Sequence, residues 1–124
     1  MALDRSQIAL PSLPEELVPV PSLGGDVLVR GMLLNESLEH DTRVRLASAA
    51  LPGESEDEAR ARAGSAVIGM TLHVCVVDEA GNRLFSAAEW NRIGVTDEHR
   101  ADIYKLFNVA RRLSGREKAD VSKN

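Results

Sequence analysis

Four prolines within the first 21 residues of this 124-residue chain restrict its folding more than any other sequence feature. Proline fixes φ and lacks a backbone N–H, so it excludes an α-helix from that region. Residues 1–17 are therefore predicted to form an extended, partly mobile arm. The prolines are Pro11, Pro14, Pro19 and Pro21.

An alternating pattern follows the arm and predicts a β-hairpin or a pair of short strands. Val18 and Val20 alternate before a turn at residues 22–26, and Val27 and Val29 continue the period of two. The prolines flanking Val20 confine the first strand to a sheet edge, and an edge strand invites pairing with another chain. These four valines are therefore candidate residues for oligomerisation or protein binding.

The next segment carries a helical pattern. Asn35 is predicted to cap a helix that runs to about Ala50, with Leu38, Leu46 and Ala49 on or near one face. A proline–glycine pair then ends this helix.

Two patterns overlap between Ala59 and Val77. A set of small and apolar residues from 59 to 77 fits one helical face, whereas residues 68–76 alternate as in a strand. A capping box at Ser55–Glu58 stands just upstream, and it has a purpose only if a helix follows. We therefore predict a long, buried, central helix, with a strand over residues 66–77 as the alternative.

A polar reversal is predicted after this segment. Gly81 supplies the turn, and Asp78 and Glu79 are its solvated neighbours. Leu84 and Phe85 then return to the core as structural anchors.

Two further helices complete the predicted domain. Ser86 opens a short helix through Trp90, and Thr96 caps the last one. The apolar stripe of the last helix contains the expected anchors Ile103, Leu106 and Phe107, and its final turn contains Arg111 and Arg112.

The predicted fold class is α+β. Edge strands or a hairpin are followed by a mostly helical body of about four helices. Residues 18–115 are expected to form one compact domain, and residues 116–124 a disordered tail.

The sequence gives no positive evidence for catalysis. His40, His73 and His99 lie on separate segments and form no pair at metal-ligand spacing. Cys75 is the only cysteine and is predicted to be a small buried hydrophobe. We therefore expect no enzymatic activity, cofactor or metal.

Charge is distributed unevenly along the chain. Residues 100–124 hold seven Lys/Arg and three Asp/Glu, a balance of +4, whereas residues 1–99 hold eight and sixteen, a balance of −8. Opposite charge at the two ends favours head-to-tail self-association or a charged protein partner. Trp90, Arg111 and Arg112 are the interface candidates on the helices, although core packing beneath the short helix is the favoured interpretation for Trp90.

Other partners and locations are less favoured. The basic end is short and lacks interleaved aromatic residues, so nucleic acid is not expected as a partner. No apolar stretch reaches the length needed to span a membrane, and no signal peptide is apparent. We expect a cytosolic protein.

Four stretches of the chain follow one another in a characteristic order: ALDRSQIALPSLPEELVPVPSLGGDVLVRGM, VCVVDEAGNRLFS, NRIGVTDEHRADIYKLFNVARRLSG and the short polar ending REKADVSKN. In these stretches the chain resembles the tail assembly chaperones of long-tailed, siphovirus-type bacteriophages, in the shorter product that such phages make. Residues 87–90 depart from the family, which usually has an acidic pair after Leu-Phe.

This resemblance implies a non-enzymatic protein that self-associates and coats the tape measure protein in the host cytoplasm, and that is missing from the mature virion. A longer product of ribosomal frameshifting would recruit the tail tube protein. Residues 122–124 are Ser-Lys-Asn and can be encoded by a slippery heptamer. The alternative is a small head–tail adaptor that is retained in the virion.

Overall fold

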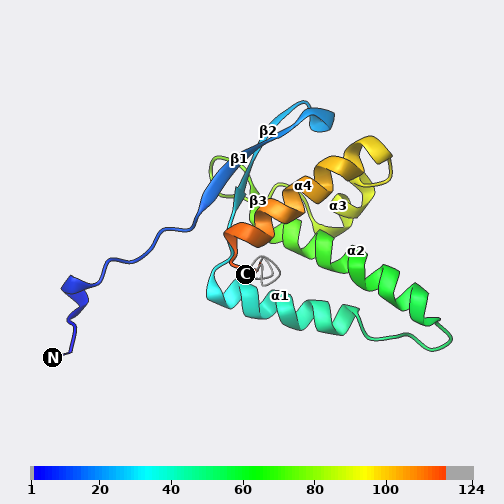
Figure 1. The fold of residues 1–124 in the computed structure, drawn as a ribbon, viewed down its shortest axis with the longest axis horizontal. Helices are drawn as coiled ribbons and strands as arrows, with labels where there is room; N and C mark the ends of the chain where they lie inside the picture. Colours follow the sequence, from blue (N-terminus) through cyan, green and yellow to red (C-terminus); the bar gives the residue numbers. More distant parts are fainter. Residues whose placement is uncertain (1, 117–124) are drawn as a thin grey trace, which may run out of the picture.

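The computed structural model describes residues 2–116 and has a small antiparallel sheet beside four α-helices (Figure 1). The predicted α+β class is confirmed. Of the predicted tail at residues 116–124, residues 117–124, with the possible frameshift codons, lie outside the described residues. Arg116 itself bonds to Ser37 and Asp41. In chain order the elements are the 3-10 turn η1 (Arg5–Gln7), β1 (Glu15–Val20), η2 (Pro21–Leu23), β2 (Gly25–Arg30), α1 (Leu34–Ala47), α2 (Glu56–Cys75), β3 (Val76–Val77), α3 (Ala87–Ile93) and α4 (Asp97–Leu113).

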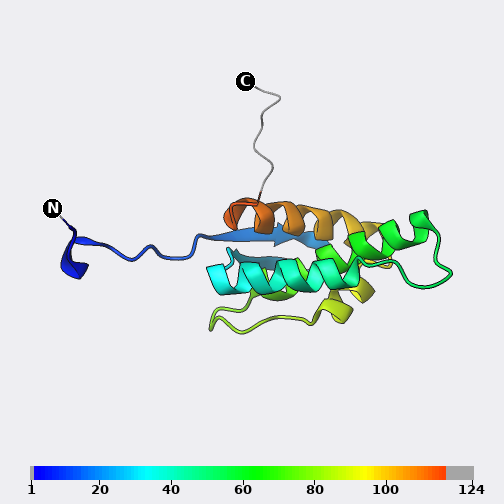
Figure 2. The same cartoon turned by 90° about the horizontal axis from the view of Figure 1, so that it is seen from below.

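The N-terminal residues form an arm that extends away from the body (Figure 2). Its apolar side chains Leu3, Ile8 and Leu10 are exposed. The first strand begins at Glu15, so the arm ends slightly before the predicted boundary at residue 17.

The predicted hairpin is formed by β1 and β2, which pair antiparallel from Glu15 opposite Arg30 to Val20 opposite Gly25. Gly24 closes the turn with a φ of 87°, in the left-handed region that favours glycine. The strand order is β1-β2-β3, so β1 lies at an edge of the sheet, as the prolines predict.

Helix and strand both occur in the segment whose patterns overlap. Ser55 accepts a hydrogen bond from the backbone N–H of Glu58 and starts α2, which runs to Cys75. The chain then becomes extended, and Val76 and Val77 pair with β2. The predicted helix is therefore correct up to Cys75 and wrong for the last two residues, because β-branched side chains fit the edge of the sheet well.

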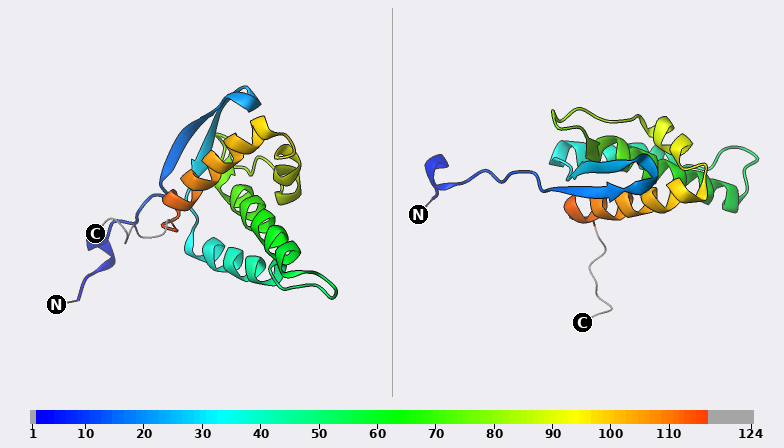
Figure 3. Two further views of the ribbon diagram at one scale, coloured as in Figure 1. Left: turned by 45° about the vertical axis from the view of Figure 1, so that its right-hand side comes forward. Right: turned by 90° about the horizontal axis from the view of Figure 1, so that it is seen from above.

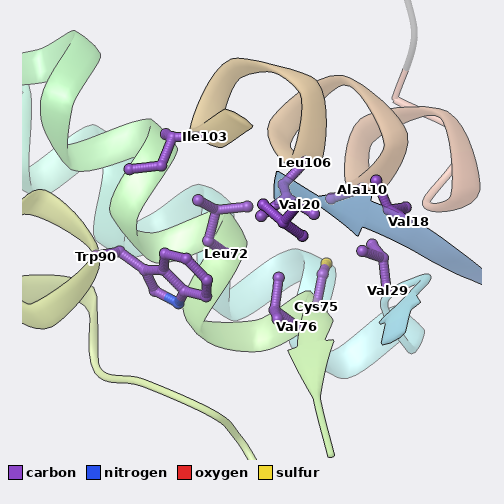
Figure 4. Packing of buried hydrophobic residues seen from close by; sticks show 10 residues of the cluster. All are labelled: Val18, Val20, Val29, Leu72, Cys75, Val76, Trp90, Ile103, Leu106 and Ala110. Carbon is purple, nitrogen blue, oxygen red and sulfur yellow. The ribbon is translucent and has the colours of Figure 1, made fainter. Parts of the chain in front are cut away.

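The core lies between one face of the sheet and the helices α2, α3 and α4. Figure 4 shows side chains from all of these elements converging there. α4 supplies Ile103, Leu106 and Ala110, and Phe107 packs partly buried against the same cluster. The other buried members are Val18, Val20, Val29, Leu72, Cys75, Val76 and Trp90.

Close backbone approach makes Gly31 necessary where β2 ends. A Cβ at this position would lie 2.5 Å from the carbonyl oxygen of Leu113, which is too short for any real contact. The end of α4 can therefore pack directly against the chain that leads into α1.

α1 places leucine side chains on its solvent side, unlike a usual amphipathic helix. An apolar helix face ordinarily packs against the core. Here Leu38 and Leu46 are exposed, and the more buried side of the helix carries mainly polar or small side chains. These are Glu36, Ser37, His40 and Ala47, with Val44 as an apolar member. The predicted apolar face of this helix therefore lies in solvent.

The ends of α1 also differ from the prediction. Asn35 is not its cap: the helix begins after Leu33, whose backbone N–H donates to the Glu36 carboxylate at 2.9 Å. α1 ends at Ala47, and the connection to α2 is held by Arg62, which donates to Glu54 and to the carbonyl of Ala47. Figure 3 shows α1 and α2 diverging from this connection.

The predicted caps in the second half of the chain are confirmed. Ser86 and Glu89 form the reciprocal capping box of α3, and Thr96 accepts from the N–H of His99 at the start of α4. Gly81 adopts a φ of 86° in the predicted turn.

Only one of the two anchors expected after that turn joins the core. Phe85 packs partly buried against the core cluster. Leu84 is 37% exposed, so its assignment as a core anchor is wrong. The reason is that the Leu84 N–H bonds to the carbonyl of Val76, which fixes this residue at the rim of the sheet.

A matched pair of leucines tests this account of the core. Leu106→Ala removes a fully buried side chain and should lower the free energy of unfolding by about 2–5 kcal/mol. Leu84→Ala should cost less, about 1–2 kcal/mol, because more than a third of that residue already contacts water. Urea unfolding followed by circular dichroism measures both. Equal losses for the two variants would contradict the core described above.

Candidate functional site

The four valines predicted for oligomerisation do not form an exposed surface. Val18, Val20 and Val29 are buried in the core, and Val27 packs against it partly buried. Their assignment as binding residues is wrong, because the alternation of the hairpin turns these side chains toward α2 and α4. What β1 leaves at the surface is its outer edge and its opposite face.

Trp90 also belongs to the core, as the favoured interpretation predicted. It is 1% exposed, and its ring meets that of Phe85 edge to face at 5.0 Å between centroids. Its assignment as an interface residue is therefore wrong.

The two arginines at the end of α4 have partners within the chain. The guanidinium of Arg111 lies 5.4 Å from the centroid of the Phe107 ring. Arg112 donates to the carboxylate of Glu16 at 2.6 Å, which ties α4 to β1. Both arginines therefore have structural contacts.

An open cavity of about 340 Å³ lies between α1, α2 and the segment that precedes α3. No sequence pattern indicates this cavity, because its residues come from three separate segments. Its lining is charged around an apolar floor and consists of Glu36, Glu39, His40, Arg43, Met70, His73, Val74, Arg83 and Ala87.

Glu36 is the most strongly held group of this cavity. Its carboxylate accepts two hydrogen bonds from the Arg30 guanidinium, at 2.7 and 2.8 Å, and one from Arg83 at 2.9 Å. Hydrogen bonding to Arg30 lowers the pKa of Glu36 to about 2. This carboxylate therefore joins β2, α1 and the segment before α3.

Both histidines of the cavity have partners. His40 Nε2 lies 2.8 Å from the Thr71 hydroxyl, which itself donates to the carbonyl of Val67, so His40 is the donor in this pair. His73 Nδ1 lies 2.9 Å from the carbonyl oxygen of Phe85 and donates to it. The two rings thus connect α2 to its neighbours.

The remaining candidate groups are also used in local structure. The carboxylate of Asp78 accepts from the backbone N–H groups of Ala80 and Asn82, as expected for an acid of the turn. Burial raises the pKa of the Cys75 thiol, which disfavours the reactive thiolate. Across residues 2–116, no cluster of three or more His, Cys, Asp or Glu side chains is arranged to hold a metal ion.

The outer side of α1 is a candidate binding surface of the described chain. We call Leu34, Leu38 and Leu46 the leucine face; these side chains are 76%, 59% and 69% exposed. The face extends along about 18 Å of helix at 1.5 Å per residue. Its residues show the periodicity of a core-facing stripe, so nothing in the sequence pattern distinguishes it from one.

Comparisons with protein-family models, with curated proteins and with solved structures found no match to this chain. Within the described residues, no helix is both long and apolar enough to cross a membrane.

Glu36 provides a test of the polar contacts that hold α1. Glu36→Gln keeps the size of the side chain but weakens its bonds to Arg30 and Arg83. The free energy of unfolding should therefore fall by about 1–3 kcal/mol. Glu39→Gln is the control, since Glu39 is exposed and its ion pair is with Arg43 on the same helix. Chemical denaturation measures both, and similar small losses would show that Glu36 does not hold α1.

The burial of His40 leads to a prediction about how stability depends on pH. Burial lowers its pKa below 6.5, with Arg116 contributing in the same direction and Asp41 opposing. The unfolded chain therefore binds a proton at His40 more readily than the folded chain does. The contribution of the neutral ring to folding stability is complete above pH 6.5 and is lost as the pH falls below that value. Unfolding free energies measured at pH about 7.5 and about 5.5 should therefore differ more for the wild type than for His40→Gln. An equal pH dependence in the two proteins would contradict this.

Proposed function

We propose that this chain is a tail assembly chaperone of a long-tailed bacteriophage, which self-associates and binds the tape measure protein during tail morphogenesis. The motifs that resemble this family support the proposal. The observation that carries it is the leucine face of α1, where three leucines on one side of the helix are exposed to solvent.

A surface of this kind suits a client with long apolar helices. A row of leucines along a helix can cover the apolar stripe of a second helix, which would otherwise aggregate. One such contact is small, and it gains strength when associated copies present it repeatedly along the client. Self-association and client binding are therefore parts of one mechanism.

The proposal includes the biological setting of the family. The protein acts in the host cytoplasm and is missing from the mature virion. A longer product made by frameshifting recruits the tail tube protein. No catalytic step is required, since the protein works by covering apolar surface.

Co-expression with the tape measure protein of the same phage tests this function. Wild-type chain should keep that protein in the soluble fraction and co-purify with it. Leu34→Glu combined with Leu38→Glu should reduce the co-purified amount at least about tenfold, because charge replaces the apolar contact. Val95→Glu is the control, as Val95 is exposed outside the leucine face.

Two outcomes would contradict the proposal. One is a tape measure protein whose solubility is the same with and without this chain. The other is recovery of the chain in purified virions as a regular component, which mass spectrometry would detect and which would favour the head–tail adaptor.

A further inference from the structure

The outer edge of β1 carries unpaired backbone groups whose positions follow from the register. Gly31 N–H donates to the carbonyl of Pro14 at 2.9 Å, so this pair is a hydrogen-bonded one. Hydrogen-bonded and non-bonded pairs alternate in an antiparallel ladder. The backbone groups of Glu15, Leu17 and Pro19 therefore point away from β2.

Pro19 fits this outward position. Proline lacks the N–H that an inward position would need for pairing with β2, and at the free edge nothing in the hairpin requires that donor. The groups available on the edge are then the N–H and C=O of Glu15 and of Leu17, and the C=O of Pro19. Among the described residues no strand pairs with this edge.

An apolar row crosses the sheet on the side away from the core and reaches this edge. Leu17 is paired with Leu28, and Leu28 is paired with Val77. Val77 is buried and Leu28 is partly buried, but Leu17 is 64% exposed. The apolar row is therefore buried at Val77 on β3 and exposed at Leu17 on the edge strand β1.

We propose that β1 pairs with β1 of a second copy of this chain, antiparallel and with the two-fold axis at Leu17, to give a continuous six-stranded sheet. β1 lies at the outer side of the hairpin in two further views (Figure 3). The partner is a second copy because the edge is complementary to itself when reversed about Leu17.

The hydrogen bonds match in this arrangement. The two Leu17 residues exchange N–H to C=O bonds, and each Glu15 N–H donates to the Pro19 carbonyl of the other copy. The donor that Pro19 lacks leaves only the Glu15 carbonyl without a bond, at the end of the ladder where water reaches it. A register centred elsewhere on the strand would place Pro19 opposite Leu17 or shorten the pairing.

Side chains and charges also agree with this register. The exposed Leu17 side chains of the two copies meet and join their apolar rows across the sheet. Glu15 comes opposite Pro19, so like charges do not face each other across the new pair. Glu16 stays with Arg112 of its own chain.

This inference rests on the self-association part of the proposed function and adds its geometry. The edge strand and the leucine face belong to different elements of the fold, so pairing through β1 leaves α1 available to a client.

Sedimentation of the purified chain without any client tests the pairing. The wild type should dimerise at micromolar concentration or associate further. Leu17→Lys should raise the dissociation constant at least about tenfold, because like charges would meet at the axis. Leu51→Lys, the matched control on an exposed leucine outside both β1 and the leucine face, should leave that constant unchanged. Circular dichroism should show the same fold in all three.

Cross-linking gives the position of the axis. Paired Leu17 residues would have Cα atoms about 5.5 Å apart, within disulfide range. Leu17→Cys should therefore form a covalent dimer on mild oxidation, while Leu51→Cys should not. The native Cys75 is buried and should not compete.

The outcomes separate this inference from the proposed function. A monomeric wild type, or association that persists unchanged in Leu17→Lys, overturns pairing through β1. If that association persists and the tape measure protein is still protected, the chaperone function stands without this geometry. If the edge dimer forms but the tape measure protein is not protected, the geometry stands and the proposed client is wrong.

Discussion

The placement of α1 depends on the carboxylate of Glu36, which binds Arg30 at the end of β2 and Arg83 before α3. Polar contacts hold the same helix at two other points, where His40 meets Thr71 and where Asp41 meets Arg116. A helix held by charged and polar side chains does not need its leucines for packing. The leucine face is free for a partner because Glu36 and its neighbours hold the opposite side.

The hairpin shows a complementary division of roles. Its valines fill the core against α2 and α4, so they cannot also provide a binding surface. The strand still has an outer edge with unpaired backbone groups, and Leu17 stands exposed beside it. Association through β1 would therefore use backbone hydrogen bonds and one leucine, while the side chains that stabilise the domain stay in place.

These two surfaces together describe how a small chain could cover a much longer client. Pairing through β1 would bring two domains together, and α1 of each would present its leucine face. The uneven charge along the chain is partly neutralised within the fold, since Arg112 and Arg116 from the basic end pair with Glu16 and Asp41. This internal pairing weakens the case for head-to-tail association driven by charge.

The sequence by itself determined the features that depend on neighbouring residues. The prolines specified an arm and an edge strand, and Ser55, Ser86 and Thr96 specified the helix starts, because capping and proline geometry act over a few residues. Tertiary structure decided which side of each element is buried. The periodicity of α1 could not reveal that its leucines face solvent, since Arg30 and Arg83, which hold Glu36, come from distant parts of the chain. The same holds for the end of α2, where pairing with β2 makes Val76 and Val77 a strand, and for the burial of Trp90.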